Sequence, residues 1–153
     1  MKTLKLGILA ITMLTTIGLG TSSLAAPKAK YVSRTELHCL AKNIYMEARG
    51  ESLEGQIAVA RVTVNRVRDP GYHSTVCGVV YAYKQFSWTL DKRKRVVDQK
   101  AWRAALDISR AVLTQSIPLP HFPATHFHTR QVNPYWAKTK TRVAVIGNHI
   151  FYS

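Results

Sequence analysis

Apolar residues recur every three or four positions between Leu37 and Ala48, which is the spacing of one buried helix face. Ser33 precedes this stretch and Glu36 follows three positions later, so the pair predicts a capping box at the helix start. Gly50 stands where helices commonly end, because glycine readily adopts the left-handed conformation there. The pattern predicts a helix from Ser33 to Gly50.

Three further helices are predicted from the same spacing. Ser52 caps the second, which ends near Val67 before an Asp-Pro-Gly turn. A short helix is expected at residues 74–83 and a longer one at residues 98–115. A loop containing residues 85–88, followed by a basic run, joins the last two.

The pattern of residue types changes after three prolines between residues 118 and 123, which end helical structure. Short segments rich in β-branched and aromatic residues follow at 125–128, 142–146 and 149–152, with Gly147-Asn148 as a turn or bulge. They predict a small C-terminal sheet or hairpin. The fold class is therefore α+β with helices dominant, in one domain over residues 33–153.

The first 25 residues have the features of a signal peptide. Two lysines precede an apolar run over residues 6–19, and Ser23-Leu-Ala25 forms a small-x-small cleavage site. The apolar run is too short for a comfortable membrane span. We expect a basic linker at residues 26–32, no transmembrane span in the mature chain, and a location in the periplasm or at the cell wall outside the cell.

The net positive charge of the chain indicates anionic partners but does not identify which one. The chain of 153 residues has a formal net charge of +14, and loss of two lysines with the signal peptide leaves +12. Such a domain is attracted to nucleic acid, anionic lipid and the anionic bacterial wall. The basic runs at residues 92–95 and 138–142 lack apolar spacing, so we interpret them as solvated surface.

Export also bears on the cysteines, of which the chain has two, Cys39 and Cys77. In an oxidising compartment an isolated pair commonly forms a disulfide, and we predict that bond here. The alternative is two unpaired buried thiols.

Three of the eight acidic residues lie between residues 43 and 56, in a chain that is otherwise poor in carboxylates. Glu47 falls in the last turn of the first predicted helix, at the edge of its apolar stripe. The helix dipole and partial burial should both raise its pKa, although Arg49 opposes them. A carboxyl that stays protonated near neutral pH suits a general acid. The alternative is a surface glutamate paired with Arg49 or Lys42.

A second catalytic carboxylate is hard to find. Glu51 and Glu54 lie beyond the helix break, Asp69 lies in a turn, and Asp91 opens the basic run. Glycosidases commonly use two carboxylates at a controlled separation. The scarcity of acidic residues in this chain favours a mechanism with one catalytic carboxylate. In that mechanism the C6 hydroxyl of a muramic acid sugar is the nucleophile, and the product is a 1,6-anhydro sugar.

Five motifs in order resemble the SleB/CwlJ-type cell wall hydrolases, named for spore-cortex-lytic enzymes. The motifs lie at residues 45–51, 55–60, 64–67, 85–87 and 146–152, and the similarity as a whole covers roughly residues 36–152. The resemblance implies cleavage of peptidoglycan between N-acetylmuramic acid and N-acetylglucosamine. It also implies a lysozyme-like, lytic transglycosylase-like fold. We expect no cofactor, a monomer, and peptidoglycan as the partner.

The resemblance assigns the catalytic glutamate to Glu47, the first of the Glu-Ala-Arg-Gly-Glu run. The matching glycan-cleft positions are Gln85, Phe86, Ser87, Asn148 and His149. Because aromatic rings stack on sugar faces, Tyr45, Tyr135 and Trp136 are further candidates for substrate binding. We expect no separate wall-binding domain of the kind that many spore members carry, and this expectation argues against a spore role.

Two other functions remain open. His126 and His128 would share one face of a strand, and with His149 they could bind zinc in a wall amidase or peptidase. No His-Glu-x-x-His motif supports this, and we expect no metal. A non-enzymatic cationic module that binds the wall or nucleic acid would leave the Glu47 cluster unexplained. We expect no nucleic acid partner.

Overall fold

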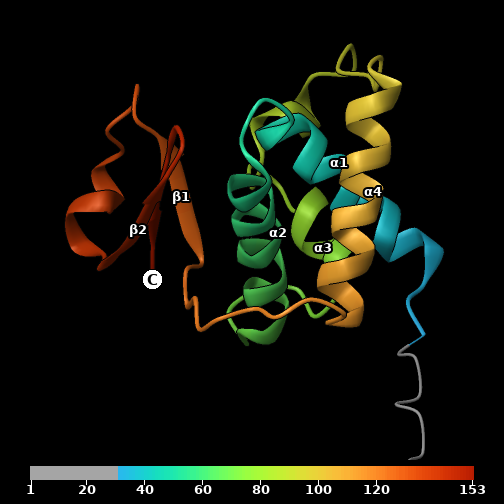
Figure 1. Cartoon of the computed structure of the whole chain (residues 1–153). Helices are drawn as coiled ribbons and strands as arrows, with labels where there is room; N and C mark the ends of the chain where they lie inside the picture. Colours follow the sequence, from blue (N-terminus) through green and yellow to red (C-terminus); the bar gives the residue numbers. More distant parts are fainter. Residues whose placement is uncertain (1–30) are drawn as a thin grey trace, which may run out of the picture.

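The computed structural model describes residues 31–153, so the predicted signal peptide and most of the linker lie outside the described residues (Figure 1). The helices and strands are α1 (Arg34–Ala48), α2 (Leu53–Arg68), α3 (Val76–Tyr81), the 3-10 helix η1 (Ser87–Leu90), α4 (Gln99–Thr114), β1 (His126–Thr129), the 3-10 helix η2 (Tyr135–Thr139), β2 (Arg142–Ile146) and β3 (His149–Tyr152). The helix-dominant α+β class is confirmed.

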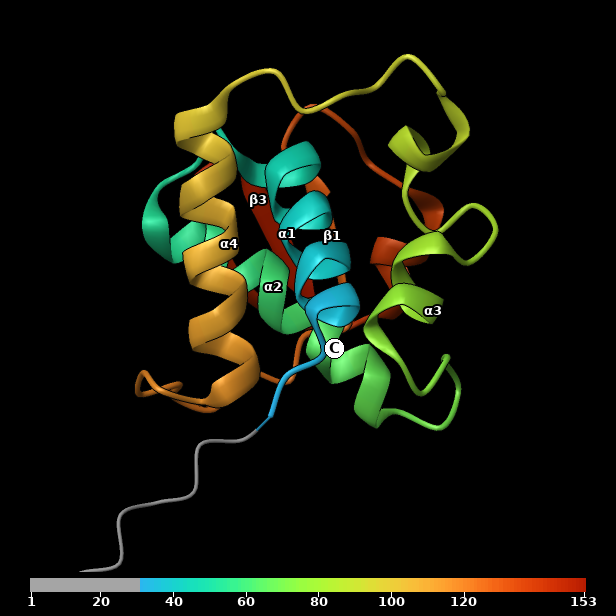
Figure 2. The ribbon, with the colours of Figure 1, turned by 90° about the vertical axis from the view of Figure 1, so that its right-hand side faces the viewer.

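Helix α1 lies at the centre of the helical layer. Figure 2 shows α4 on one side of it and α3 on the other, and Figure 1 places α2 between these helices and the sheet. Leu40, Ala41 and Ile44 of α1 are fully buried. Within residues 31–153 no helix is both long enough and apolar enough to cross a membrane.

The sheet is antiparallel with strand order β1-β3-β2, so the last strand lies in the middle. Its inner face packs on α2 through a small core that includes Val59, Val62 and Phe151. The register pairs Thr129 with His149, and a β-bulge interrupts β2. The predicted sheet is therefore confirmed, and its closing turn lies beside the end of α1 and the start of α2.

A buried polar contact joins three of these elements. The Asn43 side chain is fully buried, its amide nitrogen donates to the Thr63 hydroxyl at 3.1 Å, and its oxygen accepts from the Trp88 indole at 3.3 Å. Because both ends of the amide are satisfied, its burial costs little. The contact fixes α1, α2 and η1 relative to one another.

The predicted capping box at Ser33 is wrong. Ser33 occupies the N-cap position without a side-chain hydrogen bond, and the Glu36 carboxylate accepts instead from the backbone N–H groups of Val76 and Cys77. Glu36 thus caps α3, which is close in space but far along the chain. The Ser52 cap is confirmed, since its hydroxyl accepts from the Gly55 N–H at 3.2 Å.

The third helix is shorter than expected because Thr75, rather than Ser74, caps it. The Thr75 hydroxyl accepts from the Gly78 N–H at 3.1 Å, and Ala82 has already left the helical conformation. The helix is nevertheless held firmly, because the predicted disulfide between Cys39 and Cys77 joins it to α1.

Loss of this disulfide should destabilise the domain strongly. The bond closes a loop with a sequence separation of 38. Removal of such a constraint from the unfolded chain changes stability by about 4 kcal/mol in the chain-entropy model. We expect the Cys39→Ala/Cys77→Ala variant to lose about this much in a urea titration. A midpoint equal to that of the parent, with free thiols detected in the parent, would contradict the bond.

Candidate active site

Glu47 lines a cavity at the end of α1. The cavity has a volume of about 390 Å³ and is enclosed by the last turn of α1, by η1 and by the segment from Asp91 to Val97. Its walls include Glu47, Arg49, Ser87, Trp88, Asp91 and Arg95. Because Lys94 also lines it, part of the basic run predicted as plain solvated surface borders this cavity.

Burial raises the pKa of the Glu47 carboxyl, and the positive charge of Arg66 opposes the rise. The position at the negative end of a helix also disfavours the anion. Arg49 was expected to lower the Glu47 pKa, but the charge that lowers it is that of Arg66. The Arg49 guanidinium instead donates to the Tyr45 carbonyl at 3.3 Å and lies over the Tyr45 ring. The carboxyl is therefore disposed to hold a proton.

Arg66 is a buried cation whose role the sequence pattern did not reveal. Its Nε donates to the Thr125 carbonyl at 2.6 Å and its Nη1 donates to Gln85 Oε1 at 3.3 Å. The guanidinium carbon lies 5.4 Å from the ring centres of both Tyr72 and Phe86. Among residues 31–153 no carboxylate forms an ion pair with it. The Arg66 guanidinium is thus held in place by neutral groups, namely a carbonyl, an amide and two aromatic rings.

A second carboxylate, Asp91, lines the same cavity. Hydrogen bonds from the Arg93 side chain and backbone lower the Asp91 pKa, and the Arg93 Nε lies 3.1 Å from Asp91 Oδ1. The cavity therefore contains one carboxyl whose pKa is raised and one whose pKa is lowered. Such a pair is the arrangement in which one group donates a proton while the other remains charged.

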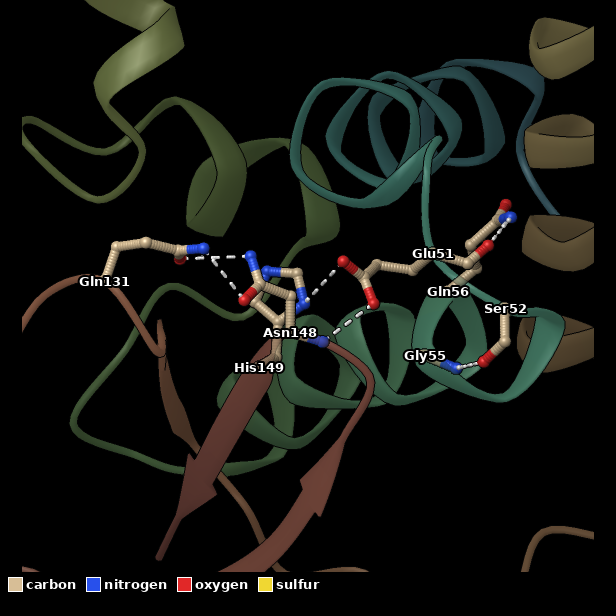
Figure 3. Close-up of polar contacts among 7 residues, drawn as sticks. All are labelled: Glu51, Ser52, Gly55, Gln56, Gln131, Asn148 and His149. Carbon is tan, nitrogen blue, oxygen red and sulfur yellow. Dashed lines mark hydrogen bonds and ion pairs between the residues drawn. The ribbon is translucent and has the colours of Figure 1, made fainter.

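Glu51 holds the turn between β2 and β3 against the end of α1 (Figure 3). Its Oε2 accepts from the Asn148 N–H at 3.0 Å, and its Oε1 lies 3.9 Å from His149 Nδ1. Burial lowers the His149 pKa and the Glu51 charge opposes this. At Gly147, where φ is +56°, an added Cβ would overlap the Glu51 carboxylate. Glu51 therefore has a structural contact that the sequence pattern did not reveal.

The predicted binding residues Asn148 and His149 belong to this contact. The Asn148 side chain exchanges hydrogen bonds of 3.1 Å with the Gln131 side chain, as Figure 3 shows. His149 is 2% exposed, so its ring is largely covered by protein. Their substrate-binding roles remain predictions.

Tyr45, predicted to stack on sugar, and Phe86, predicted to line the glycan cleft, are both buried in the protein. Tyr45 is 1% exposed, and its hydroxyl accepts from the N–H groups of Val97 and Asp98 at 3.1 Å each. Phe86 is 4% exposed and packs beside Phe127. Neither ring presents a free face, so the structure gives both residues a role in building the walls. The prediction of sugar contact and the observed burial differ because tertiary packing covers both rings.

The other four predicted residues are divided between two regions. Ser87 is exposed and lines the Glu47 cavity, and the exposed Gln85 is held by Arg66. Tyr135 projects from η2 with 81% of its surface exposed. The Trp136 ring packs instead against the rings of His126, His128 and Tyr152. Ser87 is the member of this group that the structure brings to the cavity.

The three histidines of the zinc hypothesis do not assemble. His126 and His128 lie on the sheet face that Trp136 covers, whereas the pairing of His149 with Thr129 places His149 on the opposite face. His128 Nε2 lies 3.0 Å from the Tyr152 hydroxyl. In the described part of the chain no three His, Cys, Asp or Glu residues are arranged to hold a metal ion. The predicted ligand set is therefore wrong.

The contact between Glu51 and Gly147 generates a stability prediction. We expect Gly147→Ala to destabilise the domain by about 2 kcal/mol or more, because a left-handed residue and a steric overlap act together. In a Glu51→Ala background the cost should fall to about 1 kcal/mol, since only the backbone strain remains. Urea titrations of the four proteins in this double-mutant cycle measure both values.

The matched control is Gly50→Ala, because a Cβ at Gly50 meets nothing within 4 Å. Its effect should stay within about 0.5 kcal/mol. Equal costs for Gly147→Ala with and without the Glu51 carboxylate would refute the contact.

Comparison with known proteins shows the family of this chain. Residues 50–152 match the family described as Cell Wall Hydrolase, a span that begins just after Glu47. The spore cortex-lytic enzyme of Oceanobacillus iheyensis is 31% identical over 135 residues, which is 86% of this chain and 46% of that protein. That of Halalkalibacterium halodurans is 33% identical over 121 residues, 78% of this chain and 35% of that protein. The chain thus spans less than half the length of these relatives.

Two solved structures share the fold. The catalytic domain of the Bacillus cereus SleB protein has a TM-score of 0.64 and 28% identity, covering 81% of this chain and 94% of that one. The catalytic domain of the germination-specific lytic transglycosylase SleB from Bacillus anthracis has a TM-score of 0.65 and 28% identity, covering 84% and 100%. The resemblance seen in the sequence motifs is confirmed, and the chain belongs to the Cell Wall Hydrolase family.

Proposed function

We propose that this protein cleaves the glycan strands of peptidoglycan between N-acetylmuramic acid and N-acetylglucosamine, with Glu47 as the general acid. One observation carries the proposal. Glu47 is a half-buried carboxyl with a raised pKa, and it faces an open cavity of about 390 Å³ that can hold a sugar ring. The similarity to spore cortex-lytic enzymes and to the SleB lytic transglycosylase domain supports the choice of substrate.

In this mechanism protonated Glu47 donates its proton to the glycosidic oxygen, and the bond to the anomeric carbon breaks. The leaving sugar departs with a new hydroxyl group, and positive charge develops on the muramic acid ring. The C6 hydroxyl of that ring then attacks the anomeric carbon, and the Glu47 carboxylate accepts its proton. The product is a 1,6-anhydro muramic acid end, and Glu47 is again protonated.

Arg66 has a defined part in this cycle. Once Glu47 has given up its proton it is a carboxylate in a partly dry site, and the fixed charge of Arg66 stabilises it. The same charge keeps the Glu47 pKa from rising too far for proton transfer to the substrate. The hydrogen bonds from Arg66 to Thr125 and Gln85 hold the charge at this position during the reaction.

We infer that the protein acts outside the cytoplasm, in the periplasm or at the wall, and its monomeric state remains a prediction. The substrate supports this location, and the signal peptide at residues 1–25 remains a prediction. Lys94 and Arg95 at the cavity would attract anionic wall.

The roles of the two cavity carboxylates can be separated by mutation. We expect Glu47→Gln to lower cleavage of purified peptidoglycan by at least about a hundredfold, because glutamine cannot donate the proton. Asp91→Asn should stay within a few-fold of the parent and still produce anhydro ends. Mass spectrometry of the released muropeptides measures both rate and product. Near-parental activity of Glu47→Gln would overturn the assignment.

The lowered pKa of Asp91 favours one alternative, hydrolysis with Asp91 as the second carboxylate. In that case Asp91→Asn would be inactive and the parent would release reducing ends rather than anhydro ends. The same muropeptide spectra therefore distinguish the two mechanisms.

Glu47 should also lower stability as the pH rises. Its pKa is higher in the folded than in the unfolded protein, so its favourable contribution is present at low pH and is lost as the pH rises through the folded pKa. We expect the melting temperature of Glu47→Gln to match that of the parent near pH 4 and to exceed it increasingly toward pH 8. The exposed Glu54 supplies the control variant, Glu54→Gln. A pH-independent difference would argue against a desolvated carboxyl.

A further inference from the structure

A second cavity lies beside α1, closer to its start, and the proposed chemistry does not use it. It has a volume of about 610 Å³ and lies between the first half of α1, the end of α3 and the start of α4. The residues that characterise it are Arg34, His38, Lys42, Tyr81 and Trp102. We refer to it as the α1 cavity. Figure 2 shows the three helices that surround it.

The α1 cavity combines aromatic walls with unpaired positive charge. The His38 and Trp102 rings meet edge to face at 5.9 Å, and Tyr81 is 54% exposed. No acidic residue lines it, and within residues 31–153 neither Arg34 nor Lys42 takes part in an ion pair. A ligand that fits has carboxylates for the cations and apolar groups for the rings, which describes an acidic peptide.

The α1 cavity is close to the catalytic one. Lys42 lines the first and Glu47 the second, and five residues of helix separate them by about 7.5 Å along the axis. The partition between the cavities is the segment with Val96 on one side and Val97 on the other. The Tyr45 hydroxyl holds this segment by accepting the Val97 N–H. The two cavities are thus fixed at a short distance.

We propose that the α1 cavity is a subsite for the acidic peptide attached to the muramic acid of the substrate. This inference rests on the proposed function, because it assumes a muramic acid bound beside Glu47. A peptide of four residues reaches about 13 Å when extended, which is enough to cross the partition. A carboxylate near the end of the peptide would pair with Lys42, and Arg34 would add attraction from the far end of the cavity. The peptide backbone would lie against Tyr81 and Trp102.

Binding of a synthetic peptide tests the subsite directly. The probes are a tetrapeptide with two free carboxylates and its fully amidated twin, titrated by calorimetry into the mature Glu47→Gln protein at 0.15 M salt. We expect the acidic peptide to bind about fivefold more tightly than its twin, since one exposed ion pair contributes up to about fivefold. Arg34→Gln/Lys42→Gln should remove this preference.

The matched control is Arg103→Gln/Arg110→Gln, which removes two exposed charges of α4 that lie outside the cavity. The control should retain the preference for the acidic peptide. Equal binding of the two peptides to the parent, or an equal loss in the control, would overturn the subsite and indicate only general attraction to positive charge.

Kinetics on glycan strands with and without peptides give an independent readout. We expect Arg34→Gln/Lys42→Gln to lower kcat/KM about fivefold on peptide-bearing strands and to leave it unchanged on stripped strands. Equal effects on both substrates would overturn the subsite alone. If the parent with Glu47 intact cleaves neither substrate, the proposed function fails, while the peptide titration still decides whether the cavity binds acidic peptide.

Discussion

A buried helix that ends in an open cavity is the constraint on which the rest of this structure depends. The middle of α1 is fully enclosed, with Leu40, Ala41 and Ile44 inaccessible to solvent. Close packing of such a core leaves the helix little freedom to rotate or slide. Glu47 extends from the last turn, so its position is set by side chains that have no part in the chemistry. The Asn43 contacts and the disulfide restrain the same helix.

Three of the eight carboxylates in this basic chain have structural roles. Glu36 caps α3, Asp98 caps α4 by accepting from two backbone N–H groups, and Glu51 holds the β2–β3 turn. Scarcity alone would have suggested that the whole cluster near residue 50 serves catalysis. The structure instead leaves Glu47 as the member of that cluster that is desolvated and faces a cavity.

Local patterns in the sequence predicted what depends on neighbouring residues, and they failed where distant segments meet. The helix of residues 98–115 was predicted well because its apolar face and its Asp98 cap are both local. The role of Glu36 was not, since its partners are about 40 positions away. Arg66 was missed for the same reason: its partners Thr125 and Gln85 come from other elements. A pattern also cannot tell whether an aromatic residue such as Tyr45 will face a cavity or its wall.

The strong positive charge of the chain raises the question of how Glu47 remains a useful acid. Every cation nearby favours the ionised carboxylate, so burial must outweigh them if the proton is to stay. Lys94 and Arg95 at the cavity are exposed and are screened by water and salt, which limits their effect. Arg66 is buried, and its interaction with Glu47 is screened far less. Exposed charges can therefore attract an anionic wall, while burial raises the pKa of Glu47 and the buried charge of Arg66 limits that rise.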